Sequence, residues 1–132
     1  MSNILVIDDD RSILNTLNKT LSFLGHNVKI ACDGDEGIAA FSDGIYFDFV
    51  ITDINMPKFT GYTVAKYIRT SDRRNTPIIA ITGSIDNSHR DLFDFVLMKP
   101  FKIEDLVDTL GLLHKHNTKI FERSQLMFVK EM

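Results

Sequence analysis

The chain has 132 residues, 44% of them hydrophobic and 25% charged, which is typical of one globular domain with room for a sizeable core. Its net charge of -3 argues against a general nucleic-acid surface, because neutralising phosphates requires clustered Lys and Arg. Cys32 is the only cysteine and no apolar run reaches about 18 residues, so we expect a cytoplasmic protein without disulfides or a membrane span.

The first predicted elements are a buried strand, an amphipathic helix and a weaker strand. Residues 4–7 are a continuous apolar run that stops at three aspartates, which predicts a strand buried on both faces. Asp10 can cap a helix whose apolar stripe ends at Leu24, and Gly25 suits the position that follows. Residues 27–31 are a less hydrophobic strand, which we place towards an edge of the sheet.

The middle of the chain contains a strand that ends in a single carboxylate. A short helix is predicted over 35–41, and an apolar run then begins at Phe49 and leads to Asp53. The turn sequence Asn-Met-Pro follows at once, which places Asp53 at the end of a buried strand. Thr60 is a suitable N-cap for a third helix over 61–69.

Two more strands and a final helix are predicted in the remainder of the chain. Residues 77–81 form a β-rich run that begins with proline and ends before Thr82. A strand over 95–98 ends before Lys99, and a final helix follows with its apolar stripe over 103–113. The segment between the last two strands is polar and short, so we expect a fourth helix of about two turns at most.

The alternation of strands and helices predicts an α/β domain with a doubly wound parallel sheet. In such a sheet the carboxyl ends of all the strands lie along one edge, where ligands bind. Each residue at these ends has an ordinary explanation by itself, as a cap, a turn residue or a surface charge. Together we expect them to converge on one site, which consists of Asp8, Asp9, Asp53, Thr82 and Lys99.

These converging side chains suit phosphoryl transfer. Carboxylates a few Å apart repel by roughly 4 kcal/mol per pair, and a bound cation such as Mg²⁺ relieves that repulsion. Asp53 can then attack a phosphoryl group and form an aspartyl phosphate. Lys99 offers a positive charge and Thr82 a hydroxyl donor to the phosphoryl oxygens. Positioning and charge neutralisation are what this chemistry needs.

Four segments carry a resemblance to a known family. The sequences ILVIDDD, FVITDINMP, IIAITGS and LMKPF resemble the receiver domain of two-component response regulators, over about residues 3 to 114. The resemblance implies a flavodoxin-like fold with five parallel strands in the order 2-1-3-4-5. It also implies phosphorelay signal transduction, in which a histidine kinase or a histidine phosphotransfer protein loads the domain. The loaded domain then switches its contacts with a downstream protein that the sequence does not name.

The resemblance also assigns the metal site. It implies that Asp53 is the phospho-acceptor and that Asp9 and Asp53 are direct ligands of Mg²⁺. Asp8 is implied to act mainly through water, and the main-chain carbonyl of Asn55 is the implied third ligand. The implied chemistry is self-phosphorylation and self-dephosphorylation at Asp53 alone. We therefore expect that the protein does not act as an enzyme on other substrates.

The remaining roles are implied in the same way. Thr82 matches the switch hydroxyl of the family and Lys99 matches its lysine, whose bond to Pro100 is commonly cis. Asn55 and Ser84, each two positions after a key residue, match positions that tune the lifetime of the phosphate.

Three features depart from the family pattern. The aromatic residue usual three positions before the lysine is Val96 here, and the neighbouring Phe95 is expected to point to the other face. The acid usual before Gly61 is Thr60, which can still cap. The fourth helix is short, which removes surface from the usual output face. We therefore predict that this chain does not form the symmetric dimer that receivers commonly build on that face.

Two other functions fit part of the pattern. A phosphatase or phosphotransferase resembling haloacid-dehalogenase hydrolases would use the same nucleophile, but it needs a second acid two residues on, where this chain has Asn55. A flavodoxin-like cofactor binder would need a phosphate loop after the first strand, where the three aspartates repel phosphate. We expect a receiver domain over 1–115, followed over 116–132 by a tail or linker that could form an extra helix.

Overall fold

The computed structural model describes residues 1–84 and 87–115 of the chain. Within them, five parallel strands form one sheet in the order β2-β1-β3-β4-β5, which confirms the expected doubly wound topology. The strands are β1 (Asn3–Ile7), β2 (Asn27–Ala31), β3 (Phe49–Asp53), β4 (Ile78–Thr82) and β5 (Phe95–Met98). The helices are α1 (Arg11–Phe23), α2 (Gly34–Ser42), α3 (Gly61–Arg69) and α4 (Ile103–Lys115), with the 3₁₀ helix η1 (Asn87–Leu92) between β4 and β5.

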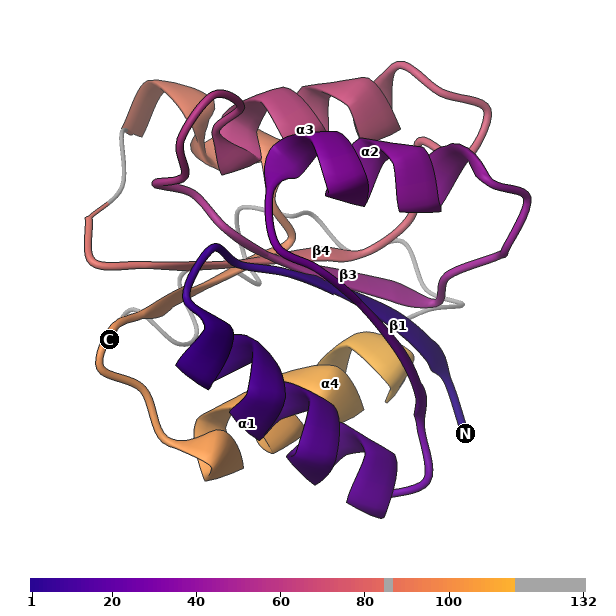
Figure 1. Ribbon diagram of the computed structural model, residues 1–132, viewed down its shortest axis with the longest axis vertical. Coiled ribbons are helices and arrows are strands. Elements are labelled where there is room, and N and C mark those ends of the chain that lie inside the picture. Colours follow the sequence, from indigo (N-terminus) through magenta and orange to yellow (C-terminus); the bar gives the residue numbers. More distant parts are fainter. Residues whose placement is uncertain (85–86, 116–132) are drawn as a thin grey trace.

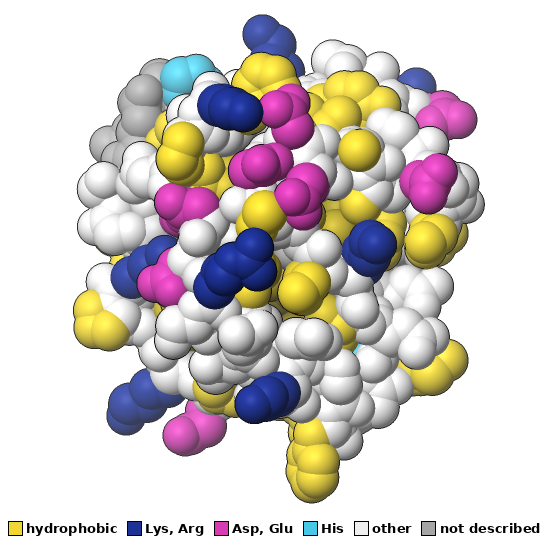
Figure 2. All heavy atoms as spheres, viewed as in Figure 1, with side chains coloured by type: hydrophobic (Ala, Val, Ile, Leu, Met, Phe, Trp, Pro, Cys, Tyr) yellow, Lys and Arg dark blue, Asp and Glu magenta, His cyan; other side chains and the backbone are white. Residues whose placement is uncertain are grey.

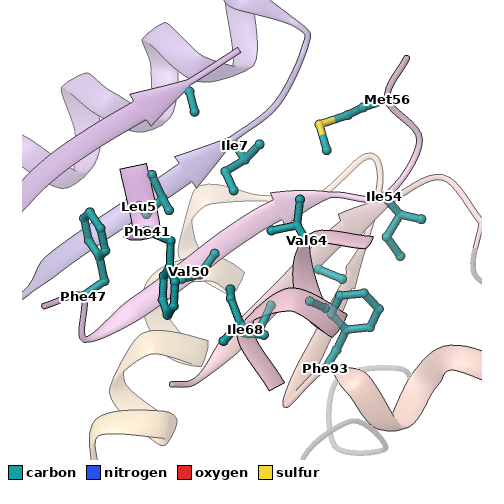
Figure 3. Close-up of a cluster of buried hydrophobic side chains, with 14 of the residues drawn as sticks. Leu5, Ile7, Phe41, Phe47, Val50, Ile54, Met56, Val64, Ile68 and Phe93 are labelled. Atoms are coloured by element: carbon teal, nitrogen blue, oxygen red, sulfur yellow. The ribbon is translucent and has the colours of Figure 1, made fainter. Parts of the chain in front are cut away.

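Two layers of helices cover the two faces of the sheet. Helices α1 and α4 lie on one face, and α2 and α3 lie on the other (Figure 1). Strands β3 and β4 are buried along their whole length, as expected of strands covered on both faces. On the α2 and α3 side, apolar side chains from the helices and the sheet form one cluster (Figure 3), which includes Phe41, Val50, Val64, Ile68 and Phe93.

The helices begin where the sequence places their caps. The Asp10 carboxylate accepts a hydrogen bond from the Ser12 N–H at 2.9 Å, and the Thr60 hydroxyl accepts one from the Thr63 N–H at 3.4 Å. After α1, Gly25 has a φ of 95°, a left-handed conformation that glycine adopts without steric cost. Helix α2 extends one residue beyond each end of the predicted range, and its earlier start follows from Asp33, which is its N-cap.

The fourth helical element is short, as predicted, but its type differs from the expected α-helical stub. It is a 3₁₀ helix of 6 residues, η1, rather than a helix of α-type hydrogen bonds. The segment offers too few residues and too weak an apolar pattern to sustain two α-helical turns. Phe93, the residue directly after η1, is buried and packs against Tyr62 of α3 at a ring-centroid distance of 5.8 Å.

Strand β5 presents its first two residues, Phe95 and Val96, to opposite sides of the sheet, as predicted. Val96 belongs to the cluster under α2 and α3, whereas Phe95 belongs to the cluster under α1 and α4. Both are buried, with exposed fractions of 1% and 0%. Val96, which stands where the family usually has an aromatic residue, is therefore a buried aliphatic side chain on the α2 and α3 side of the sheet.

None of the helices in the described part of the chain is long and apolar enough to cross a membrane. Lys and Arg side chains are scattered singly over the face shown in Figure 2, while several acidic side chains group together. Among the described residues on that face, no basic stripe of the kind that tracks a nucleic-acid backbone is visible. The expected tail, 116–132, lies outside the described residues.

Candidate functional site

The carboxyl edge of the sheet brings together side chains that are far apart in the sequence. Asp8 and Asp9 follow β1, and Asp53 is the last residue of β3. Each of the three offers a carboxylate oxygen, and these oxygens all lie within 4.8 Å of one another. Asp8 is fully buried and Asp53 is 4% exposed, whereas Asp9 is open to solvent. The acid cluster that the sequence predicted is therefore assembled, with one member accessible from outside.

Lys99 extends into the same cluster from the end of β5. Its Nζ lies 3.5 Å from Asp8 Oδ2 and 3.6 Å from Asp53 Oδ2. The main-chain N–H of Lys99 donates to the carbonyl oxygen of Thr82 at 2.7 Å, which ties the ends of β4 and β5 together. The Lys99–Pro100 peptide bond is cis, as the resemblance implied.

Burial controls the acidity of the two inner carboxyl groups. It raises the pKa of Asp8 from 3.8 to about 6, although the hydrogen bond from the Asp10 N–H acts in the opposite direction. Burial also raises the pKa of Asp53, and the Lys99 ammonium opposes that rise. Two ionised carboxylates at this depth are costly, and one ammonium offsets only part of the cost.

One oxygen of the cluster fits an added cation particularly well. Asp8 Oδ2 is buried and accepts no hydrogen bond, although Lys99 Nζ is near it. Its partner oxygen, Oδ1, accepts from the Asp10 N–H at 2.9 Å. A set of carboxylate oxygens with one accessible member and one oxygen without a hydrogen bond has the donor chemistry of a hard divalent cation site. The cluster is therefore suited to holding such a cation.

Asn55 and Thr82 meet beside the carboxylates. The Asn55 side-chain amide donates to Thr82 Oγ1 at 3.2 Å, and the Asn55 N–H donates to Asp53 Oδ1 at 3.4 Å. Thr82 is fully buried at the end of β4. The five predicted strand-end residues and Asn55 are thus neighbours in space.

Gly61 was overlooked as a site residue by the sequence reasoning, which treated it only as the first residue of a helix. A Cβ at this position would collide with the carbonyl oxygen of Asp53 and lie 2.8 Å from Ile54 Cα. The Gly61 N–H also donates to the Ile54 carbonyl oxygen at 2.8 Å. Close approach of α3 to the strand end therefore requires glycine. A Thr-Gly pair soon after a strand-end acid is the signal that could have revealed it.

Replacing Gly61 by alanine is expected to lower the free energy of unfolding by about 1–3 kcal/mol and to displace Asp53, because the obstructing atoms belong to the main chain. Urea unfolding measures the loss. Gly111→Ala is the matched control, since a Cβ there meets nothing within 4 Å and alanine favours helix. Equal stability of the two variants would contradict the collision.

A second group of possible metal ligands, Cys32, Asp33 and Glu36, lies after β2. The Cys32 thiol donates to Glu36 Oε2 at 2.9 Å, and this hydrogen bond raises the pKa of the thiol. A protonated thiol is a poor nucleophile and a poor ligand. This geometry is typical of an unreactive cysteine at the end of a strand.

Known proteins resemble this chain in both sequence and fold. Residues 4–111 match the response regulator receiver domain family. The transcriptional regulatory protein DltR of Streptococcus agalactiae is 32% identical over 122 residues, which cover 89% of this chain and 54% of DltR. The transcriptional regulatory protein CpxR of Escherichia coli is 34% identical over 112 residues, which cover 81% of this chain and 47% of CpxR. The chain thus spans about half the length of these curated relatives.

Solved structures give the same result over nearly their whole length. The chemotaxis protein CheY4 of Vibrio cholerae has a TM-score of 0.77 and 32% identity, with 85% of this chain and 98% of that chain covered. The response regulator TrrA of Thermotoga maritima, solved in complex with Mg²⁺ and BeF, has a TM-score of 0.75 and 31% identity, with coverage of 86% and 99%. With the family match over residues 4–111, these likenesses show that the chain belongs to the response regulator receiver domains of two-component signalling.

Proposed function

We propose that Asp53 is the phospho-acceptor and that it is loaded from a phosphohistidine of a histidine kinase or a histidine phosphotransfer protein. The observation that carries the proposal is the convergence of three carboxylates within 4.8 Å, with Lys99 Nζ at 3.5 and 3.6 Å from two of them. Asp53 is the member of the set that combines a strand-end position with the Lys99 contact and the Asn55 N–H. The reaction is proposed to take place in the cytoplasm.

Mg²⁺ is the proposed cation. Asp9, Asp53 and the main-chain carbonyl of Asn55 would hold it, with Asp8 acting through water. When bound, the ion would neutralise negative charge that gathers on the phosphoryl oxygens during transfer. The buried Asp8 Oδ2, which accepts no hydrogen bond, supports the fit.

The transfer itself uses an oxygen of Asp53. A lone pair of that oxygen attacks phosphorus, an O–P bond forms, and the P–N bond to the donor imidazole breaks, so that its electron pair returns to the ring nitrogen. Water later attacks the same phosphorus, the O–P bond to Asp53 breaks and its electron pair returns to the carboxylate, and inorganic phosphate leaves with both protons of the water. Both steps take place at Asp53 alone, and no other substrate is proposed to be turned over, so the domain is proposed to act as a switch.

Lys99 and Thr82 are proposed to bind the phosphoryl oxygens. The ammonium of Lys99 already lies 3.6 Å from Asp53 Oδ2, so an added phosphoryl group would come within its reach as a point charge. Thr82 has a hydroxyl that can donate to an anionic oxygen. Burial of Asp53 strengthens both interactions, because charges attract more strongly where water is excluded.

The phosphorylated domain is proposed to pass its signal to a second protein by direct contact. The curated relatives DltR and CpxR are called transcriptional regulatory proteins and are about twice as long as the matched region. We therefore propose that residues 1–115 are the receiver unit and that phosphorylation switches its contacts with a downstream protein.

A direct test is incubation with Mg²⁺ and acetyl phosphate, followed by mass spectrometry of the intact protein. One phosphoryl group per chain is expected, and none in Asp53→Asn or after chelation of the metal. Asp43→Asn is the matched control, because Asp43 is an exposed acid at the end of α2 and its variant should be phosphorylated normally. Phosphorylation of Asp53→Asn at the wild-type level would refute the assignment. Multiple turnover of a phosphate ester would favour the phosphatase alternative.

A further inference from the structure

The Thr82 hydroxyl has an unusually complete set of partners. Thr82 Oγ1 donates to the carbonyl oxygen of Ser84 at 2.5 Å and accepts from the Ser84 N–H at 3.2 Å. It also accepts from the Asn55 side-chain amide at 3.2 Å. Thr82 has an exposed fraction of 0%, so these three bonds replace those that water would make.

These three bonds use the whole capacity of the hydroxyl. A threonine hydroxyl has one hydrogen to donate and two lone pairs to accept with. The hydrogen is committed to a carbonyl oxygen, which cannot donate, so the group that Asn55 presents must be its NH₂. The amide therefore fixes the direction in which the Thr82 hydrogen points, which is toward Ser84.

We propose that the Asn55 side chain is a positioning residue that holds the Thr82 hydroxyl turned toward Ser84 until a phosphoryl group arrives on Asp53. The proposal rests on the proposed function, because Thr82 must release the Ser84 carbonyl before it can donate to a phosphoryl oxygen on Asp53. The Asn55 bond is the part of this restraint that comes from a different strand end, since Ser84 lies on the same loop as Thr82.

The expected strength of this restraint is that of one neutral hydrogen bond. A neutral hydrogen bond between protein groups contributes a modest net free energy, which corresponds to about a threefold to tenfold change in an equilibrium constant. Removing the amide should therefore favour the state in which Thr82 faces the phosphoryl group by that factor. A side chain with a purely structural role would leave this equilibrium unchanged.

The first experiment uses the full chain without metal. NMR three-bond couplings to the Thr82 methyl group report its χ1 rotamer, and the wild type is expected to show one rotamer. Asn55→Ala, which keeps the main chain, is expected to populate a second rotamer. Ser84→Ala is the matched control, because it keeps the N–H and the carbonyl that bind Thr82 and should show the wild-type rotamer. An unchanged rotamer in Asn55→Ala would overturn the proposal.

The second experiment measures the affinity of the full chain for beryllofluoride, a tetrahedral mimic of the phosphoryl group, by calorimetry at saturating Mg²⁺. Asn55→Ala is expected to bind about three to ten times more tightly than the wild type. In a Thr82→Val background, where no hydroxyl remains to be held, Asn55→Ala should leave the affinity unchanged. Weaker binding by Asn55→Ala, or the same gain with and without the hydroxyl, would overturn the proposal.

The outcomes separate this proposal from the proposed function. If the wild type does not bind beryllofluoride, or if Asp53→Asn binds it equally well, the assignment of Asp53 fails. If binding requires Asp53 but Asn55→Ala gains nothing, the assignment of Asp53 stands and the role of Asn55 fails.

Discussion

Replacing Arg69 by methionine is expected to lower the free energy of unfolding by about 3–5 kcal/mol, because the change removes the guanidinium that pairs with a buried carboxylate. Arg69 ends α3, and its Nη2 lies 2.8 Å from Asp94 Oδ2. The guanidinium also donates to three main-chain carbonyl oxygens at 2.6–3.1 Å, those of Leu92, Arg74 and Thr76. The two charged side chains are only 10% and 13% exposed, so water cannot replace the lost bonds.

The effect should reach the site through the sheet. Asp94 Oδ2 also accepts from the Ile78 N–H at 2.8 Å, and the Asp94 N–H donates to the Ile78 carbonyl at 2.9 Å. Arg69 and Asp94 therefore fix the start of β4 beside the segment that leads into β5. Thr82 and Lys99 are at the other ends of these two strands, so their relative position depends on this anchor.

Urea unfolding at pH 7 measures the loss, and Arg74→Met is the matched control. Arg74 is exposed and contributes its main-chain carbonyl to Arg69, so its variant should stay within about 0.5 kcal/mol of the wild type. Arg69→Lys keeps the charge but not the planar fork, and it should recover only part of the stability. A loss in Arg69→Met no larger than in Arg74→Met would show that the network is not stabilising.

The sequence predicted those features that depend on local pattern. Asp10 and Thr60 were recognised as helix caps because capping uses residues within three positions of one another. The strand ends were recognised because an apolar run stops at a polar residue, and parallel topology then places all such ends at one edge. The convergence of Asp8, Asp53 and Lys99 follows from this reasoning without any distance being known.

The features that could not be predicted depend on distances between elements. Arg69 and Asp94 are 25 positions apart, and nothing in either segment indicates that they meet. The amide of Asn55 reaches Thr82 across 27 positions, so the sequence could mark both residues but not the bond between them. The 3₁₀ type of η1 was also not predicted, because a short polar segment has no periodicity that separates 3₁₀ from α geometry.

Replacing Asp8 by asparagine is expected to have opposite effects on metal binding and on the stability of the metal-free protein. Asp8 is proposed to act on Mg²⁺ through water, and loss of such an outer partner weakens metal binding by about 10–100-fold. The same change removes a buried negative charge from beside Asp53. Asparagine keeps an oxygen that can accept from the Asp10 N–H, so the metal-free domain loses a charge but not that hydrogen bond.

The gain in stability should depend on pH in a defined direction. The pKa of Asp8 in the folded protein is about 6, above the ordinary value of 3.8, so between these pH values the folded state binds more protons than the unfolded state. The contribution of this group to stability is therefore present at low pH and is lost as the pH rises through about 6. At pH 7 the ionised Asp8 costs about 1–3 kcal/mol, and Asp8→Asn should recover that amount.

Urea unfolding in the presence of a chelator measures this gain, and calorimetric titration with Mg²⁺ measures the affinity. The stability difference between Asp8→Asn and the wild type should shrink as the pH falls toward 4, because Asp8 of the wild type then becomes neutral. Asp10→Asn is the matched control, since it removes a charge from the same acidic run while asparagine caps α1 equally well. A metal-free Asp8→Asn protein that is less stable than the wild type at pH 7 would mean that the Lys99 contact outweighs the cost of burial, and the cluster would then be stable without any cation.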